Sequence, residues 1–317
     1  MDWRALKAFL LYAAFAAGCA TPQYTVRQTP APEESAWARQ LEQTISTHQA
    51  KEFERQQARQ VAEGERLFGF DVQRVVKTLS RVTERPYLNY RVFLYQDRDP
   101  NAAALADGRV YVSTGMLNYL ASRGSRESEL AFVLAHELAH TVAQHLVKRY
   151  RQLQQQEMVM ALVGLGTAVA TRGASAHTQQ AGRLAQDVAS LVNDVAISGY
   201  SQEQELEADQ LGIRYVIRAG YDPKAAFALL QDFTRFEAGG PFLRTHPYIQ
   251  QRAQDLERYL QETGVLATTV PRTAYQVPEH PLEACTRLHE AMKLYPPGSV
   301  SWQNLQRELL AHRCPEK

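Results

Sequence analysis

His136, Glu137 and His140 form an HExxH pattern inside an apolar stretch, free of proline and glycine, that begins near Ser128. Residues four apart lie on the same face of a helix, so both imidazoles can bind one zinc ion. Glu137 can then reach a water molecule that zinc activates and take its proton. The pattern therefore predicts a zinc hydrolase with one zinc ion per chain.

The surroundings of the motif matter because three fixed positions occur by chance in roughly a few per cent of chains of this size. Apolar residues recur around it with the spacing expected of a buried helix. They are Leu130, Phe132, Val133, Leu134, Leu138 and Val142. The alternative, two ordinary core histidines, would leave Glu137 buried in the same turn without a partner.

A catalytic zinc ion needs three protein ligands and an open fourth position, so a third donor must come from elsewhere in the chain. Glu205 and Asp209 are four apart at the start of a later helical pattern and share a face. Glu205 can bind zinc, and Asp209 can accept the ring N–H of a ligand histidine and fix its tautomer. Alone, this acidic run would indicate only a solvated helix start. Beside the HExxH pattern it predicts His136, His140 and Glu205 as the zinc ligands.

The composition of the chain sets limits on its class. It has 317 residues, of which 45% are hydrophobic and 22% are charged, as in ordinary globular proteins. The formal net charge is +1. This gives no basic field for a nucleic acid, so we expect no nucleic-acid partner.

The N-terminus predicts export and lipid attachment. Arg4 and Lys7 precede an apolar run, Ala8–Ala17, that is too short to span a bilayer. Small residues then lead to Cys19, as at a bacterial lipoprotein cleavage site, so residues 1–18 are predicted to be a signal peptide and Cys19 to carry the lipid. A plain secretory signal with an incidental cysteine is the alternative. The expected location is the periplasm, with anchoring to the outer membrane.

A tether, a main domain and a C-terminal hairpin are expected after the signal. Residues 19–34 are rich in proline, threonine and glutamine and predict a flexible tether. Residues 35–264 carry the motifs and form the predicted catalytic domain. Residues 265–317 predict a linker and a helical hairpin, in which Cys285 and Cys314 form a disulfide. Two unpaired buried thiols are the alternative.

Periodicity predicts the elements around the first motif. Helices are expected at about 35–65 and at 71–83, followed by a strand near 90–95. Residues 103–106 and 109–113 flank Asp107-Gly108, a common hairpin turn. We therefore expect a small antiparallel sheet directly before the HExxH helix.

Further elements are expected beyond that helix. Residues 158–170 are apolar but too short for a membrane span, which indicates a core or site-covering helix or, alternatively, a membrane-dipping segment. Residues 172–178 predict a loop, and residues 202–218 predict a helix. Asp222 and Pro223 are expected to start the next helix. Pro247 is expected to do the same for a helix that ends near Glu262.

The sequence resembles the CAAX prenyl protease and HtpX family of zinc metallopeptidases, in particular its periplasmic lipoprotein branch. The matching stretches, between about 89 and 260, are 101–104 with 108–112, 114–117, 136–145, 205–209, and His246-Pro247 with Arg252. The resemblance implies an α+β fold, a mostly helical gluzincin core with the small antiparallel sheet beside the HExxH helix. The spanning helices of the integral-membrane members are absent from this sequence, so we expect a soluble, tethered enzyme.

The resemblance also implies roles for individual residues. His136, His140 and Glu205 would bind zinc, Glu137 would act as general base, and Asp209 would support the ligands. His246 and Arg252 would lie over the metal and stabilise the charged tetrahedral intermediate. His246 has two other readings: a fourth, inhibitory ligand that substrate displaces, or an extended residue before Pro247 without a catalytic role.

The expected activity is a zinc endopeptidase for quality control, which cleaves unfolded or misassembled envelope proteins. Substrate is expected to add as a strand along one segment of the sheet. That segment comprises Arg109, Val110, Tyr111, Val112 and Ser113. One alternative is a non-proteolytic assembly or chaperone factor at the outer membrane that uses zinc structurally, possible partners being the outer-membrane assembly machinery. A third is a zinc hydrolase that acts on cell-wall peptides.

Overall fold

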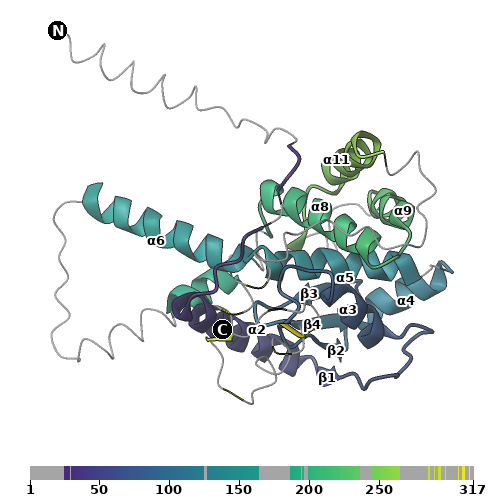
Figure 1. The fold of residues 1–317 in the computed structure, drawn as a ribbon, viewed down its shortest axis with the longest axis horizontal. Coiled ribbons are helices and arrows are strands. Elements are labelled where there is room, and N and C mark those ends of the chain that lie inside the picture. Colours follow the sequence, from purple (N-terminus) through teal and green to yellow (C-terminus); the bar gives the residue numbers. More distant parts are fainter. Residues whose placement is uncertain are drawn as a thin grey trace, which may run out of the picture.

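The structure is a computed structural model that describes residues 25–28, 30–124, 127–163, 186–193, 195, 199–235 and 245–264, with single positions between 285 and 314. It is mostly helical with one small sheet, as expected for an α+β fold (Figure 1). The elements are α2 (Ala36–Arg55), β1 (Arg59–Gln60), α3 (Val72–Ser80), β2 (Arg91–Tyr95), β3 (Ala102–Ala104), β4 (Arg109–Ser113), α4 (Thr114–Ser122), α5 (Glu127–Val142), α6 (His145–Val163), α8 (Gln202–Arg218), α9 (Pro223–Phe233) and α11 (Ile249–Glu262).

The sheet has four strands in the order β1-β2-β4-β3. The predicted hairpin is confirmed: β3 and β4 pair antiparallel around Gly108, whose φ of +93° suits glycine. The prediction of a wholly antiparallel sheet is wrong. Because the hairpin places β4 rather than β3 beside β2, β2 and β4 run parallel and the sheet is mixed.

Alternating side chains bury both faces of the sheet. Val92 and Val110 belong to the core cluster shared with α3 and α5. Phe93 and Tyr111 point the other way, and Tyr111 stacks on Phe93 and on Phe53 of α2, with a ring-centroid distance of 4.1 Å between Phe53 and Tyr111. The sheet therefore lies between α2 on one side and the helix that carries HExxH on the other.

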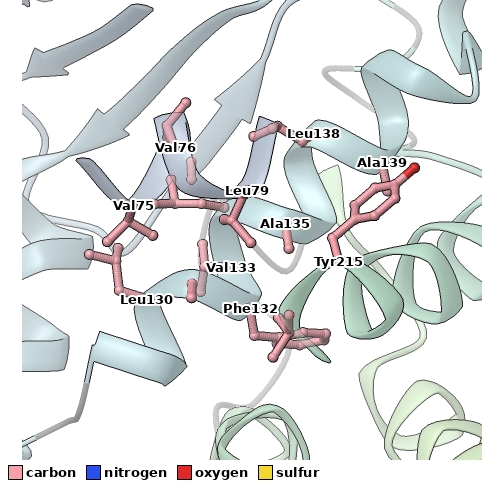
Figure 2. Packing of buried hydrophobic residues seen from close by; sticks show 14 of the residues in the cluster. Val75, Val76, Leu79, Leu130, Phe132, Val133, Ala135, Leu138, Ala139 and Tyr215 are labelled. Carbon is pink, nitrogen blue, oxygen red and sulfur yellow. The ribbon is translucent and has the colours of Figure 1, made fainter. Parts of the chain in front are cut away.

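The HExxH helix α5 is the centre of the core, as its apolar spacing predicted. Figure 2 shows Val75 and Leu79 of α3 near Leu130 and Val133 of α5, with Tyr215 of α8 on another side of α5. Every residue of α5 from position 130 to 142 is buried. A helix covered on all sides is held rigidly, which suits residues that must converge on one ion.

Several helix boundaries follow local capping chemistry. Asp71 caps α3, and Ser201 forms a capping box at α8. Asp222 caps α9 with Pro223 at its first position, as predicted. Two expectations are wrong. The first long helix ends at Arg55 rather than near 65, because the chain turns at Gln57 (φ +55°) to pair β1 with β2.

The start of α11 also differs from the prediction. Pro247 does not open the helix, which begins at Ile249 after Tyr248 in the left-handed conformation (φ +64°). The backbone N–H of Arg252 bonds to the Tyr248 carbonyl, so the helix starts two residues later than predicted. The predicted end at Glu262 is confirmed.

The N-terminal segment is not a free tether over its whole predicted length. The Gln210 side chain bonds to the Thr25 carbonyl and the Arg27 N–H, and Gln144 bonds to both backbone groups of Glu33. Glu34 pairs with the fully buried guanidinium of Arg85. These polar partners hold residues 25–28 and 30–34 against the folded domain, although the composition of this segment alone predicts a flexible chain.

Several predictions lie outside the described residues: the signal peptide 1–18, Cys19 with the start of the tether, most of the apolar segment 158–170, the loop 172–178 and most of the C-terminal hairpin. The Cys285–Cys314 disulfide is present, with the two Cα atoms 5.4 Å apart. Among the helices that the structure describes, none is both long and apolar enough to cross a membrane.

Candidate active site

The site lies where α5 and α8 pack side by side. Gly212 of α8 allows this approach, because a Cβ at this position would lie only 3.0 Å from the backbone nitrogen of His136. Such a distance is far tighter than ordinary packing, so a larger residue would push the helices apart. Gly212 therefore sets the spacing between the HExxH motif and the acidic residues of α8.

Four donors converge between these helices. One ligand atom from each of His136, His140, Glu205 and His246 lies within 4.8 Å of the others, and all four residues are buried. The Nε2 atoms of His136 and His140 are 3.1 Å apart, and Glu205 Oε1 is 3.5 Å from His140 Nε2. The structure thus brings together the two motif histidines and the glutamate, and adds His246.

This donor set fits a metal ion. Two imidazole Nε2 atoms that face each other in a buried space need a shared cation or proton between them. Burial and His136 lower the pKa of His140 well below its usual range, so its imidazole is neutral, the form that binds a metal. Imidazole nitrogens with one carboxylate suit zinc among the common metals.

The carboxylate of Asp209 holds His136 from behind. Asp209 Oδ1 is 2.9 Å from His136 Nδ1, the nitrogen that points away from the other donors. Burial and the Arg252 guanidinium disfavour the His136 cation, but Asp209 and Glu205 outweigh them and raise its pKa to about 9. The sequence assigned Asp209 to a ligand histidine, and the structure places it against His136.

Glu137 lies on the same side of the cluster as His246. One carboxylate oxygen accepts the backbone N–H of Ala104 at 3.2 Å, which fixes the side chain against β3. The other, Oε1, is 3.2 Å from His246 Nε2 but makes no well-directed hydrogen bond. Burial raises the pKa of this carboxyl, which favours proton uptake. A buried carboxylate oxygen facing the donor cluster can act on a water molecule bound there.

Arg252 contacts Asp209 and Glu205, which favours a role in holding the ligands; its stabilisation of the tetrahedral intermediate stays a prediction. Its guanidinium bonds to Asp209 at 2.7 and 2.8 Å and to Glu205 Oε2 at 2.7 Å. It also donates to the His246 carbonyl. Burial opposes ionisation of Glu205, but Arg252 and His246 outweigh it and hold the pKa of Glu205 well below its usual range.

His246 lies inside the donor cluster, as the interpretation of this residue as a fourth ligand requires. Its Nδ1 is 3.1 Å from Glu205 Oε1 and 3.2 Å from His136 Nε2. The ring thus lies between the other donors and the Glu137 carboxylate, whose Oε1 is 3.2 Å from His246 Nε2. This position fits a fourth donor, and it also fits a group that faces the reacting carbonyl once displaced.

The substrate strand predicted at residues 109–113 is contradicted by the topology. Both edges of β4 are already paired, with β2 on one side and β3 on the other. A peptide needs an unpaired edge to add as a strand. In the four-stranded sheet the outer strand next to Glu137 is β3.

Sequence reasoning missed two contributors. Tyr200 stacks on the His140 ring with centroids 3.9 Å apart. Glu207 is 3.3 Å from His145, whose Nδ1 is 2.7 Å from His140 Nδ1. Glu207 was readable as part of the acidic run on α8, but its contact with His145 depends on the break between α5 and α6 at Gln144, which the local sequence does not reveal.

Two histidines and a glutamate that converge beside a buried general-base carboxylate form the donor set of a metallohydrolase. Comparison with known families makes this specific: the family described as Peptidase family M48 matches residues 70–260, more than half of the chain. The chain belongs to this family.

Individual relatives that the chain resembles are named as proteases or metalloendopeptidases. A mitochondrial metalloendopeptidase OMA1 of Schizosaccharomyces pombe is 30% identical over 202 residues, 62% of this chain and 55% of that protein. A beta-barrel assembly-enhancing protease of Escherichia coli is 30% identical over 170 residues, 52% of this chain and 33% of that protein. The Saccharomyces cerevisiae OMA1 is 23% identical over 274 residues, 77% and 72% of the two chains. The chain thus spans about half and a third of the first two relatives.

Proposed function

We propose that this protein is a zinc endopeptidase of the bacterial envelope that cleaves unfolded or misassembled proteins. The carrying observation is the convergence of buried His136, His140 and Glu205 beside Glu137. Membership of a peptidase family and the relatives' names as metalloendopeptidase and protease support the reaction class.

The chemistry follows from the positions of the side chains. His136, His140 and Glu205 would hold zinc, which lowers the pKa of water and polarises a peptide carbonyl when bound. Glu137 would take a proton from water and pass it to the leaving amine. The raised pKa of Glu137 suits both steps, and its bond to Ala104 keeps the carboxylate aligned with the sheet edge.

The substrate would lie along the outer edge of β3. Asn101 and Leu105, on either side of β3, direct their backbone groups toward β4. The Leu105 N–H donates to the Arg109 carbonyl, and the Ser113 N–H donates to the Asn101 carbonyl. In an antiparallel ladder, the backbone groups of Ala102 and Ala104 then point away from β4. The N–H of Ala104 bonds to Glu137, and the other groups would pair with an added peptide. Pairing of this kind reads backbone rather than side chains, so it suits unfolded chains of varied sequence.

His246 would have two positions, one as a metal ligand without substrate and one displaced from the metal when substrate binds. As a fourth donor His246 would close the site, and an incoming carbonyl would have to displace it. Once displaced it could donate a hydrogen bond to the oxyanion. Such a closed site would protect the envelope from indiscriminate cleavage.

The envelope location is part of the proposal. The predicted signal at residues 1–18 and lipid attachment at Cys19 would place the enzyme in the periplasm at the outer membrane. The Escherichia coli relative named as a beta-barrel assembly-enhancing protease supports substrates from outer-membrane assembly. That assembly machinery is then the expected partner.

The test is a protease assay on the mature chain with an unfolded outer-membrane protein. We expect cleavage that a chelator abolishes and that one equivalent of zinc per chain restores, with little cleavage of the same substrate once folded. Zinc binding without cleavage of any unfolded protein would contradict the proposal and favour the non-proteolytic chaperone. Preference for cell-wall peptides over unfolded protein would favour the third alternative.

A further inference from the structure

His140 is oriented by a second histidine rather than by a carboxylate. Its Nδ1 is 2.7 Å from Nδ1 of His145, which is fully buried. On the other side of the same ring, His145 Nε2 is 3.3 Å from Glu207 Oε2. His140, His145 and Glu207 therefore form a continuous chain of polar contacts that leads away from the donor cluster.

Only one arrangement of protons satisfies this chain when His140 Nε2 serves as a ligand. Nε2 must then offer its lone pair, so the ring proton of His140 lies on Nδ1. That N–H donates to His145 Nδ1, which must accept, and the His145 proton then lies on Nε2. The Nε2–H of His145 donates to Glu207, whose carboxylate is a pure acceptor.

The fold brings His145 to this position through a break in the helix. In a continuous helix, residues five apart point in different directions and do not face each other. Here α5 ends and Gln144 adopts a left-handed conformation (φ +54°) before α6 begins at His145. The unusual φ at a non-glycine residue is maintained by the contacts of Gln144 with Glu33 and Glu42.

The bridging histidine also explains the spacing of acids on α8. Glu205 and Asp209 share a face and reach the cluster and His136 directly. Glu207, two residues from each, projects from another side of α8. His145 spans the gap, and Gln204 Nε2 fixes it further by donating to the His145 carbonyl at 3.3 Å. Residues of α8 thus orient both motif histidines. Asp209 contacts His136 directly, and Glu207 reaches His140 through His145, an arrangement called the relay below.

We propose that His145 and Glu207 are positioning residues that fix the tautomer and ring orientation of His140 for metal binding. This inference rests on the proposed zinc site. Removing an outer partner of a ligand histidine typically weakens metal binding by 10- to 100-fold. The effect should therefore be seen in metal affinity itself, before any assay of hydrolysis.

The experiment measures zinc dissociation constants of the full mature protein by competition with a chromophoric chelator. His145→Leu removes the acceptor, and we expect zinc affinity to fall about 10- to 100-fold. His145→Asn keeps an acceptor, because Asn Oδ1 occupies nearly the position of His Nδ1, and should stay within about threefold of wild type. Glu207→Ala should weaken binding by roughly tenfold.

Glu203→Ala is the matched control, since Glu203 is an exposed acid on the same helix. It should leave zinc affinity unchanged. The absorption spectrum of the cobalt-loaded protein is a second readout, which should change in His145→Leu and remain close to wild type in His145→Asn. Circular dichroism of chelator-treated samples verifies that each variant is folded.

Equal zinc affinity in folded His145→Leu and wild type would overturn the inference while leaving the zinc site intact. If His145→Leu does not fold, Glu207→Ala decides: affinity equal to that of Glu203→Ala would overturn the relay, and a selective loss would support it. A wild-type protein that binds no zinc would instead overturn the proposed function, and the relay with it.

Discussion

Replacing Arg252 with methionine separates two roles for this residue. The guanidinium is 2% exposed and contacts Asp209 and Glu205 at 2.7 Å. Methionine fills a similar space but leaves two buried carboxylates without their cation. Breaking a buried ion pair by removing one partner costs about 3 to 5 kcal/mol. A bound zinc ion would neutralise Glu205, so the loss in zinc-loaded protein should be about half as large.

The assay is urea unfolding with chelator and with saturating zinc, together with kcat at saturating zinc. A residue that only supports ligands should change kcat by less than about tenfold once zinc is saturating, whereas loss of an oxyanion donor costs about 100- to 1,000-fold. Arg258→Met is the control on the same helix, because Arg258 is exposed and should change stability by less than about 0.5 kcal/mol. Unchanged stability of Arg252→Met with a 100-fold fall in kcat would refute the positioning role.

Three further predictions concern packing, titration and the disulfide. Gly212→Ala places a Cβ 3.0 Å from the His136 backbone and should cost about 1 to 3 kcal/mol in urea unfolding while weakening zinc binding; wild-type values for both would contradict this packing argument. In metal-free protein, the raised pKa of His136, about 9, adds stability that is fully present below pH 6.5 and lost as pH rises through 9. Chelator-treated protein should thus lose up to about 3 kcal/mol over that range, and a flat profile would rule this out. The double variant Cys285→Ala, Cys314→Ala opens a loop with a sequence separation of 29 and should lose about 3 kcal/mol in thermal unfolding with unchanged zinc affinity, whereas a change in affinity would link the disulfide to the site.

Local signals in the sequence were enough to predict much of the fold. The apolar periodicity of the HExxH helix, the Asp222-Pro223 start of α9 and the Asp107-Gly108 turn each depend on neighbours within a few positions. Residue spacing also predicted that His136, His140 and Glu205 would converge, because a catalytic zinc ion needs three protein ligands. Their convergence follows from two short motifs on two well-defined helices.

The features that the sequence left undecided are those that only the tertiary arrangement determines. Which strand of the hairpin becomes the outer one depends on the pairing of β2, and no residue of β4 encodes that choice locally. The direction of the Arg252 side chain depends on Asp209 and Glu205, which are more than 40 positions away. Likewise, Glu34 lies in a segment whose composition predicts a tether, but its carboxylate pairs with Arg85 inside the folded domain.

The central claim is that Glu137 acts as the base beside a zinc ion held by the motif histidines and Glu205. Its most direct test is the rate of cleavage of an unfolded protein by Glu137→Gln at zinc content equal to wild type. The substitution keeps the shape and the Ala104 contact but removes the base. We predict one zinc ion per chain in both proteins and a rate lower by roughly 100- to 10,000-fold in the variant. Equal rates would contradict the account.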